Sequence, residues 1–575
     1  MKKLAKLLSL LMALMLLLSS SALAELPSYL HVGQTPLVDE PVTLKVAVLC
    51  KEETTEPTNS WVYAYIEQVL GIKIDLEFFY PATRNESISL MMASGDLPDM
   101  IIGTSLTSSE LSIYGEAEGM LLDLSPYITE ENAPNLTKLY AENPQLRREL
   151  TTPSGAMYSL GYVALDPKGS QSMRMFYNFD WLEELNLQVP TTLDEFLDML
   201  RAFKAKGEAE GKEVIPFGGN SARYNCTYLI LNALGYNISG TWSRQKDFET
   251  TIALRNGEVV LPCYDREVFP KYLETMHTMY EEKLMEQDFY TLDKDTTKSH
   301  LVAGMYGVFP EVVALYAPLE FGAQYFGGIP LTSEYNETPF WPNYTGQTIG
   351  AFVVSAETEY PELCVAFADF VCNPEISDDF FVNVYGPSIK QTDILLDKTS
   401  GWYYDADLKD RTSQDYIDHK DEYSSYNYYR YNKIALWKPN TFGIEPIRLD
   451  DILDENGNSI KLCEYPESGD LMEVAKVRKT AGNLNDQYKL SQVLSWGKYL
   501  SQEFSPNVCY FDEETTLRVD ELNTLIKEYA SQEIAKFVIG TRDLSEVDKF
   551  FDELEKLGAD EYVQYYADYY AATKD

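Results

Sequence analysis

At 575 residues the chain is too long for one compact core, and its composition, 45% hydrophobic and 24% charged, is that of a globular protein. The formal net charge of −43 argues against a nucleic-acid backbone or an anionic membrane as a partner, because both would repel the chain. We interpret the excess of acidic residues as a solubility feature and not as a binding surface.

The chain begins with the three parts of a secretory signal peptide. Lysines occupy three of residues 2–6, Leu7–Leu18 is almost entirely apolar, and Ala22–Ala24 has the small residues of a cleavage site. The apolar run is shorter than the ~20 residues that span a bilayer. We therefore expect residues 1–24 to be removed and the exported, soluble protein to begin at Glu25 with a net charge of −46, because three lysines and no acidic residue are lost. Residues 25–42 are expected to form a flexible leader.

Strands and helices alternate in the first region of the mature chain. The predicted strands cover residues 43–49, 72–78 and 100–102, and the predicted helices run from Asn59 or Ser60 to Leu70 and over 85–94. This order is typical of a parallel sheet with helices on its faces. In MMASGDLPDMII, Gly95 is expected to end the second helix and Pro98 to prevent its continuation, so that the chain enters the strand at 100–102.

A second α/β region begins near Met173. Its predicted strands are MRMFYNF (173–179), 214–220 and YGVFP (306–310), and its predicted helices begin at Asp180 and at the Thr192–Glu195 capping box and cover 264–287. A strand over 348–355 and a helix from Pro361 to Asn373 are expected next, followed by a tyrosine-rich stretch near 402–435 with weak periodicity. The final segment of the chain is expected to be helical.

Several motifs, taken in order, resemble those of family 1 extracellular solute-binding proteins, which are the receptor components of ABC importers, mostly for sugars and oligosaccharides. The motifs are LMMASGDLPDMII (90–102), GMLLDLSPYI (119–128), PSGAMYSL (153–160), MFYNFDWLEELNLQVPTTLDEFLDMLRAFK (175–204), EEKLMEQDF (281–289) and the segment 536–570, which is similar to the long lipoprotein branch. The resemblance runs from about residue 43 to the end of the chain and is poor over 400–500.

The resemblance implies a two-lobed α/β fold of the type II periplasmic-binding-protein class, with a hinge and a ligand cleft between the lobes. The first lobe would comprise 43–164 and about 340–388, and the second 165–339 and about 389–575. It further implies a monomer that binds a small solute, an oligosaccharide or related carbohydrate, without covalent change and presents it to a membrane permease. Members from Gram-positive bacteria usually carry a lipid-anchored cysteine at the cleavage site. Glu25 stands there in this chain and Cys50 lies too far on, so periplasmic or extracellular release is favoured over lipid anchoring.

A carbohydrate site needs flat aromatic faces together with a few hydroxyl, amide or carboxylate groups. In open parallel sheets, ligands bind beyond the carboxyl ends of the strands. Residues of suitable type at such predicted positions are the ligand-binding candidates: Trp61, Thr104, Ser105, Asn220, Tyr224, Phe309 and Trp341. Two other residues are expected to be structural, because Asp99 precedes a buried strand and can bind backbone donors, and Trp181 lies on a helix.

No enzymatic motif stands out, since HExxH, GxSxG, Walker and GxGxxG patterns are not found. A secreted glycosidase stays an alternative, because 90 acidic residues could supply a facing pair of carboxylates. Two further alternatives stay open, a receptor for a peptide or a cationic nutrient and a sensor subunit.

No cofactor or metal is predicted. The four histidines are far apart, and the seven cysteines are odd in number and widely spaced without a CxxC pair, so no disulfide framework is expected. The segment 454–458 has the first ligand positions of a calcium loop, but Gly457 and Glu464 stand out of register with that loop. A simple Asn-Gly turn is the favoured interpretation.

Overall fold

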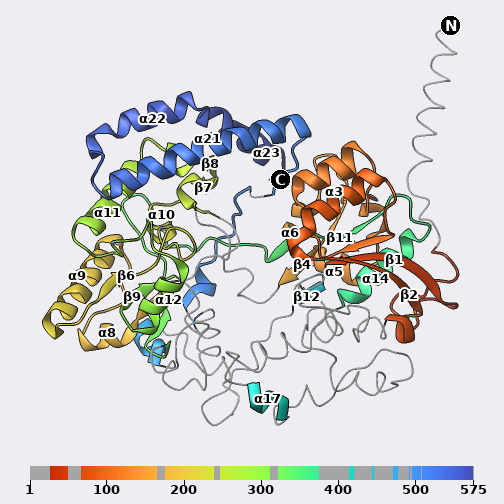
Figure 1. Ribbon diagram of the computed structural model, residues 1–575, viewed down its shortest axis with the longest axis horizontal. Coiled ribbons are helices and arrows are strands. Elements are labelled where there is room, and N and C mark those ends of the chain that lie inside the picture. Colours follow the sequence, from red (N-terminus) through yellow and green to blue (C-terminus); the bar gives the residue numbers. More distant parts are fainter. Residues whose placement is uncertain are drawn as a thin grey trace, which may run out of the picture.

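The structure is a computed structural model, and it describes residues 26–49, 66–164, 175–238, 247–310, 322–373, 414–419, 443–445, 470–476, 491, 495–506 and 508–573. Two lobes lie side by side, and the C-terminal helices cover one end of the second lobe and reach toward the first (Figure 1). Within the described ranges, no helix combines the length and the apolar character needed to cross a membrane.

A six-stranded sheet forms the centre of the first lobe. Its strands, in spatial order, are β12 (Gly443–Glu445), β4 (Leu160–Ala164), β11 (Gln347–Val354), β3 (Met100–Ile102), β1 (Val42–Leu49) and β2 (Ile72–Phe79). β1 pairs in parallel with β2 and β3, and β11 is antiparallel to β3 and β4. The carboxyl ends of β1, β2, β3 and β4 therefore lie at one edge of the sheet, where β11 begins.

Helices cover both faces of this sheet, as the alternation of β1 requires. Val46 and Val48 pack on one face with α5 (Pro134–Glu142), α6 (Pro144–Leu150) and α14 (Pro361–Val371). Ala47 and Leu49 point to the other face, where α3 (Arg84–Ser94) and α4 (Ser108–Leu111) pack. The first lobe is therefore a three-layer α/β/α structure.

The predicted turn between α3 and β3 is confirmed. Gly95 ends the helix with a left-handed backbone (φ 71°), a conformation that a residue without a Cβ adopts easily. Asp99 accepts hydrogen bonds from the backbone N–H of Lys45 (2.8 Å) and the hydroxyl of Thr358 (2.6 Å). The structural role expected for Asp99 is thus confirmed, because its carboxylate joins the start of β3 to β1 and to the segment after β11.

A four-stranded sheet forms the centre of the second lobe. Its strands, in spatial order, are β10 (Tyr325–Gly327), β5 (Phe176–Asn178), β9 (Tyr306–Phe309) and β6 (Ile215–Phe217). The surrounding helices are α8 (Phe179–Glu184), α9 (Leu193–Glu210), α10 (Tyr228–Ala233), α11 (Phe269–Glu281) and α12 (Lys294–Val302), and a separate hairpin joins β7 (Ala253–Arg255) to β8 (Glu258–Val260). One aromatic-rich core fills this lobe, and Trp181 packs against Phe203 in it, as expected (ring centroids 5.2 Å apart).

Three C-terminal helices complete the second lobe: α21 (Glu513–Val538), α22 (Val547–Lys556) and α23 (Ala559–Thr573). Leu522, Phe537 and Phe550 belong to the same core as the four-stranded sheet. The end of α23 reaches the first lobe, where Tyr569 packs against a cluster that includes Met120 and Tyr510.

The described part of the predicted element order is confirmed, with shorter bounds for several elements. The helix expected over 264–287 is α11, and the strand expected over 214–220 is β6. One element departs from the predicted division of the lobes. β12 pairs in parallel with β4, so this strand of the segment 389–575 belongs to the sheet of the first lobe and not to the second. The other lobe boundaries stay a proposal.

The signal peptide, the start of the helix ending near Leu70, the tyrosine-rich stretch and the 454–458 turn lie outside the described residues. The remaining short elements are the helices α17 (Gln414–His419) and α19 (Leu471–Val474), the π-helical segments Ile66–Leu70 and Ser112–Ala117, and the 3-10 turns Pro81–Thr83, Ser125–Tyr127, Phe248–Thr250, Pro262–Tyr264, Gly497–Tyr499 and Leu544–Glu546.

Candidate functional site

The first part of the candidate site is the loop that follows β3, residues 103–107, together with the start of α3. We call it the first-lobe edge. The Arg84 guanidinium donates two hydrogen bonds to the Glu110 carboxylate (2.7 and 2.9 Å) and others to the carbonyl oxygens of Thr104 (3.0 Å) and Ser105 (3.3 Å). One arginine thus joins the residues after β2 to the loop after β3.

Glu110 belongs to a capping box that fixes the same loop at its far end. Its N–H donates to the Thr107 hydroxyl (3.1 Å), and its carboxylate accepts from the Thr107 N–H (2.8 Å). Burial raises the pKa of Glu110, but the hydrogen bonds from Arg84 and Thr107 outweigh burial and lower it. The carboxylate is therefore held in its charged form.

A bulge in β11 lets the first-lobe edge approach the sheet. Gly350 has φ 65°, the pairing of β11 with β4 shifts register there, and a Cβ on Gly350 would lie 2.2 Å from the backbone of Leu106. The Thr104 hydroxyl donates to the carbonyl of Gly350 (3.0 Å), and the Leu106 N–H donates to the same oxygen (3.1 Å). Thr104 is buried, whereas Ser105 is half-buried with a left-handed backbone (φ 49°).

The second part of the candidate site is the loop that follows β6, residues 218–225, together with the end of β9. We call it the second-lobe edge. The Asn220 side-chain oxygen accepts from the N–H groups of Ala222, Arg223 and Tyr224 (2.8–3.2 Å), and its amide donates to the Thr297 hydroxyl (2.7 Å). Asn220 is fully buried, so its side chain fixes the loop and leaves little capacity for a ligand.

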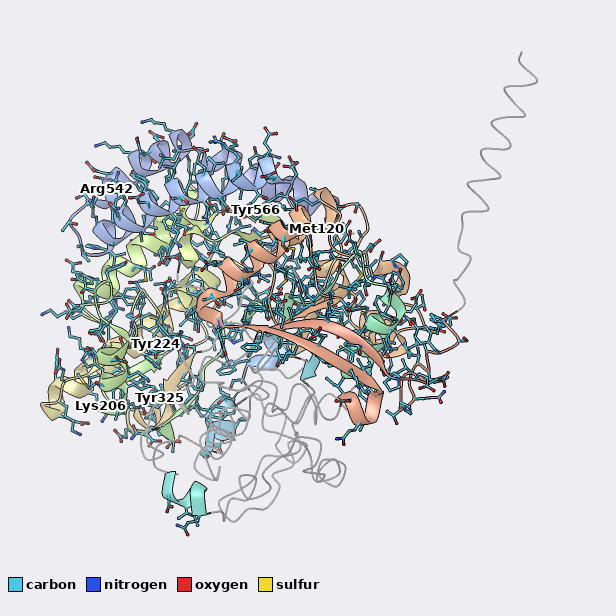
Figure 2. The ribbon with its side chains drawn as sticks, turned by 45° about the vertical axis from the view of Figure 1, so that its right-hand side comes forward. Met120, Lys206, Tyr224, Tyr325, Arg542 and Tyr566 are labelled. Carbon is cyan, nitrogen blue, oxygen red and sulfur yellow. The ribbon has the colours of Figure 1, made fainter. Side chains whose placement is uncertain are left out.

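Aromatic side chains pack beneath this loop. Tyr224 contacts Phe309, and Phe309 stacks on Tyr306 (ring centroids 5.4 and 5.3 Å apart). All three rings are buried, and Figure 2 shows Tyr224 inside the second lobe. The Tyr306 hydroxyl donates to Glu286 (3.1 Å), which also contacts His300. The second-lobe edge therefore rests on a rigid aromatic base.

The structure brings some of the sequence-derived candidates together and separates others. Thr104 and Ser105 share one edge with Arg84, and Asn220, Tyr224 and Phe309 share the other. Trp341 lies elsewhere: it is buried against Tyr228 (ring centroids 6.2 Å apart), and its backbone pairs with the segment around Leu500. Trp61 lies outside the described residues. Ligand contact by any of the seven stays a prediction.

Arg84 and Glu110 are not among the residues that the sequence predicts as candidates. The Thr107-x-x-Glu110 pattern is a capping-box signal that could have indicated the start of α4. The ion pair with Arg84 spans 26 residues of sequence, so no local pattern announces it. Within the described ranges, no group of three or more histidine, cysteine, aspartate or glutamate side chains is placed to hold a metal ion.

Comparison with known proteins assigns the family. Residues 52–377, which include both edges, match the model of the bacterial extracellular solute-binding proteins. The chain is 29% identical over 240 residues to the fructooligosaccharide ABC transporter substrate-binding protein FusA of Streptococcus pneumoniae. It is 26% identical over 255 residues to the polygalacturonan/rhamnogalacturonan-binding protein YtcQ of Bacillus subtilis. These matches cover 40% and 44% of this chain and 44% and 47% of the relatives, so each spans less than half of the relative's length.

Solved structures share the fold over a greater length. An extracellular solute-binding protein from Bifidobacterium longum subsp. infantis has a TM-score of 0.66 at 16% identity, covering 93% of this chain and 99% of that chain. FusA of S. pneumoniae in complex with kestose has a TM-score of 0.58 at 18% identity, covering 92% and 99%. At these identities the likeness shows the two-lobed fold. The family model matches more than half of the 575 residues of this chain, so the chain belongs to the bacterial extracellular solute-binding proteins.

Proposed function

We propose that this protein is the extracellular receptor of an ABC importer and that it binds an oligosaccharide or a related carbohydrate between its two lobes. The observation that carries the proposal is the family match over residues 52–377, because this range contains the loops after β3, β6 and β9. The names of two matched relatives, a fructooligosaccharide ABC transporter substrate-binding protein and a polygalacturonan/rhamnogalacturonan-binding protein, favour a carbohydrate.

The two edges differ in the chemistry that they would offer a sugar. The first-lobe edge has a half-buried serine beside the carboxylate and guanidinium of Glu110 and Arg84, whose side chains are 25% and 16% exposed. The five guanidinium N–H groups of Arg84 already donate to Asn85, Thr104, Ser105 and Glu110. The groups left to bind a sugar hydroxyl are therefore the Ser105 hydroxyl and the remaining lone pairs of the Glu110 carboxylate. On the second-lobe edge the described aromatic rings are buried, so a ring that stacks on the sugar would come from a different residue, for which Trp61 stays a candidate.

A thermal-shift screen of the mature protein against oligosaccharides, peptides and polyamines tests the ligand class, because any bound ligand raises the unfolding midpoint. We expect a shift with an oligosaccharide, and calorimetry with that sugar should give a negative heat-capacity change on binding. Analysis of the sugar after its recovery from the protein should show that it is unchanged. A shift only with peptides or polyamines would replace the carbohydrate proposal. A shortened sugar product would indicate a glycosidase.

The permease is the proposed membrane partner, and a sensor kinase is the alternative. Uptake of a labelled ligand by cells with and without this protein separates the two alternatives. Cells without the protein should lose uptake if it serves an importer and keep uptake if it serves a sensor kinase. We further propose release from the membrane after cleavage behind Ala24. Mass spectrometry of the mature amino terminus should find Glu25, and a lipid-modified cysteine would contradict this.

A further inference from the structure

The loop of the second-lobe edge uses most of its backbone donors to hold its own shape. The Asn220 side chain binds three backbone N–H groups of the loop and the Thr297 hydroxyl. The Asn220 N–H donates to the carbonyl oxygen of Tyr224 (3.0 Å), and the Ser221 N–H donates to that of Phe289 (2.9 Å). These donors are occupied within the fold, so they are not offered to a ligand.

Arg223 differs from its neighbours in this loop, because it is an exposed residue with a long charged side chain. Its backbone is fixed, since its N–H donates to the Asn220 side-chain oxygen (2.8 Å). Its guanidinium carbon lies over the buried Tyr224 ring, 6.0 Å from the ring centroid. A cation is attracted to the face of an aromatic ring at such a distance. The second-lobe edge therefore presents a cation whose backbone is held and whose position the ring restricts.

The charge of Arg223 stands alone in the two loops of the candidate site. Residues 103–107 and 218–225 contain no other charged residue. Beside the first of these loops, the Arg84 guanidinium and the Glu110 carboxylate bind each other through two hydrogen bonds, so their charges cancel. The two loops and this ion pair together carry one net positive charge, although the formal net charge of the whole chain is −43.

We propose that Arg223 is a specificity-determining residue of the receptor and that it selects an oligosaccharide carrying a carboxylate, as a uronic acid does. The planar guanidinium offers parallel N–H groups that match the two oxygens of a carboxylate. Its five donors allow it to keep a contact within the protein and to bind a ligand at the same time. The inference rests on the proposed carbohydrate-binding function and narrows its ligand class, which the family assignment leaves open between neutral and acidic sugars.

Matched pairs of sugars test this inference by calorimetry on the purified mature protein. Each pair consists of a uronic acid trisaccharide and the neutral trisaccharide with the same linkages, in which a hydroxymethyl group replaces each carboxylate. The pairs are built from galacturonic acid and galactose, glucuronic acid and glucose, and mannuronic acid and mannose. We expect at least one acidic member to bind, and its neutral counterpart to bind at least about tenfold more weakly. The affinity for the acidic member should fall as salt is raised, because Arg223 is exposed.

Three variants separate the charge of Arg223 from its shape. Arg223→Gln should weaken binding of the acidic member about 10- to 100-fold, the range expected when a hydrogen-bonded charge partner is lost. Arg223→Lys should lie between this variant and the wild type, because it keeps the charge and loses the paired donors. The matched control Arg147→Gln removes an exposed arginine from α6 and should bind as the wild type does. Thermal unfolding should give the same midpoint for Arg223→Gln and the wild type.

The outcomes distinguish this inference from the proposed function. Binding of neutral members alone, or an equal loss for both members of a pair in Arg223→Gln, would overturn the role of Arg223 and leave a carbohydrate receptor in place. If every acidic member fails to bind, the inference is wrong. If the protein responds only to peptides or polyamines, the carbohydrate function is wrong as well.

Discussion

The two edges of the candidate site are built in different ways. The first-lobe edge is held by a partly exposed ion pair, in which Arg84 binds Glu110 and two carbonyl oxygens of the loop. The second-lobe edge is held by a fully buried amide, Asn220, above the stacked rings of Tyr224 and Phe309. Charge fixes one loop, and packing with neutral hydrogen bonds fixes the other.

Because of this difference, we expect the stability of the two edges to depend differently on salt concentration and pH. Interactions between partly exposed charges weaken with salt and with protonation of the carboxylate. The contact between the Tyr224 and Phe309 rings and the neutral hydrogen bonds of Asn220 involve no group that changes its charge between pH 5 and pH 8. If the lobes close on a ligand, the second-lobe edge would act as the rigid surface and the first-lobe edge as the adjustable one. The following variants test this contrast.

Phe309→Ala should have the largest effect. The ring is fully buried between Tyr224 and Tyr306, so its removal leaves a cavity and costs about 3–5 kcal/mol of unfolding free energy. Denaturant unfolding should show this loss equally at low and high salt. Val302→Ala, at a position 38% exposed in the same lobe, is the control and should change stability by less than about 0.5 kcal/mol. A loss for Phe309→Ala as small as that of the control would contradict the rigid aromatic base.

Asn220→Ala should cost about 2–4 kcal/mol, because three backbone N–H groups and the Thr297 hydroxyl lose a buried partner together. Thr297→Val removes only one of these partners and should cost less. The loss should again be independent of pH between 5 and 8. Urea unfolding of the two variants measures both values, and equal losses would show that the backbone bonds of Asn220 add nothing.

Glu110→Gln should cost about 1–2 kcal/mol at pH 7, because the pair with Arg84 is only partly exposed. The pKa of Glu110 is lowered in the folded protein, so its contribution is present above the ordinary value of 4.5 and is lost as pH falls through the folded value. The wild type and the variant should therefore converge in acid, and high salt should narrow their difference at pH 7. A gap that is unchanged at pH 3 would show that the two edges do not differ in this respect.

Much of the fold could be predicted from the sequence, because its signals are local. Alternation in 43–49 and 72–78 marked β1 and β2, and Gly95 with Pro98 marked the entry to β3. Thr192 and Glu195 marked the start of α9, where the Thr192 hydroxyl accepts from the Glu195 N–H. In each case a few neighbouring residues decide the conformation.

The candidate site could be predicted only in position and not in contacts. The predicted strand ends placed Thr104 after β3, Asn220 after β6 and Phe309 at the end of β9, as the structure has them. Residue type alone could not show that the Asn220 side chain is occupied by its own loop. Glu149 carried no signal at all, because its partners Thr345 and Tyr510 lie about 200 and 360 residues away in sequence. Contacts of this range depend on the packing of the two lobes.

Glu149→Gln gives the smallest expected effect and has the opposite sign to that of Glu110→Gln. Burial raises the pKa of Glu149 to about 7, so the folded protein holds a proton that the unfolded chain releases near 4.5. Wild-type stability should therefore fall as pH rises from about 4.5 to 7 and then stay level. At pH 8, Glu149→Gln should be more stable than the wild type by about 1 kcal/mol, a value kept small because the Glu149 side chain is only half-buried and reaches the solvent. The gain should vanish at pH 4.5, where the side chain at position 149 is neutral in both proteins. Glu110→Gln, by contrast, loses stability only where the wild-type carboxylate is charged.

Unfolding curves at pH 4.5 and pH 8 compare the two variants. A loss for Glu149→Gln at pH 8 would mean that the ionised carboxylate is well solvated and contributes to stability in its charged form, as Glu110 does at the first-lobe edge.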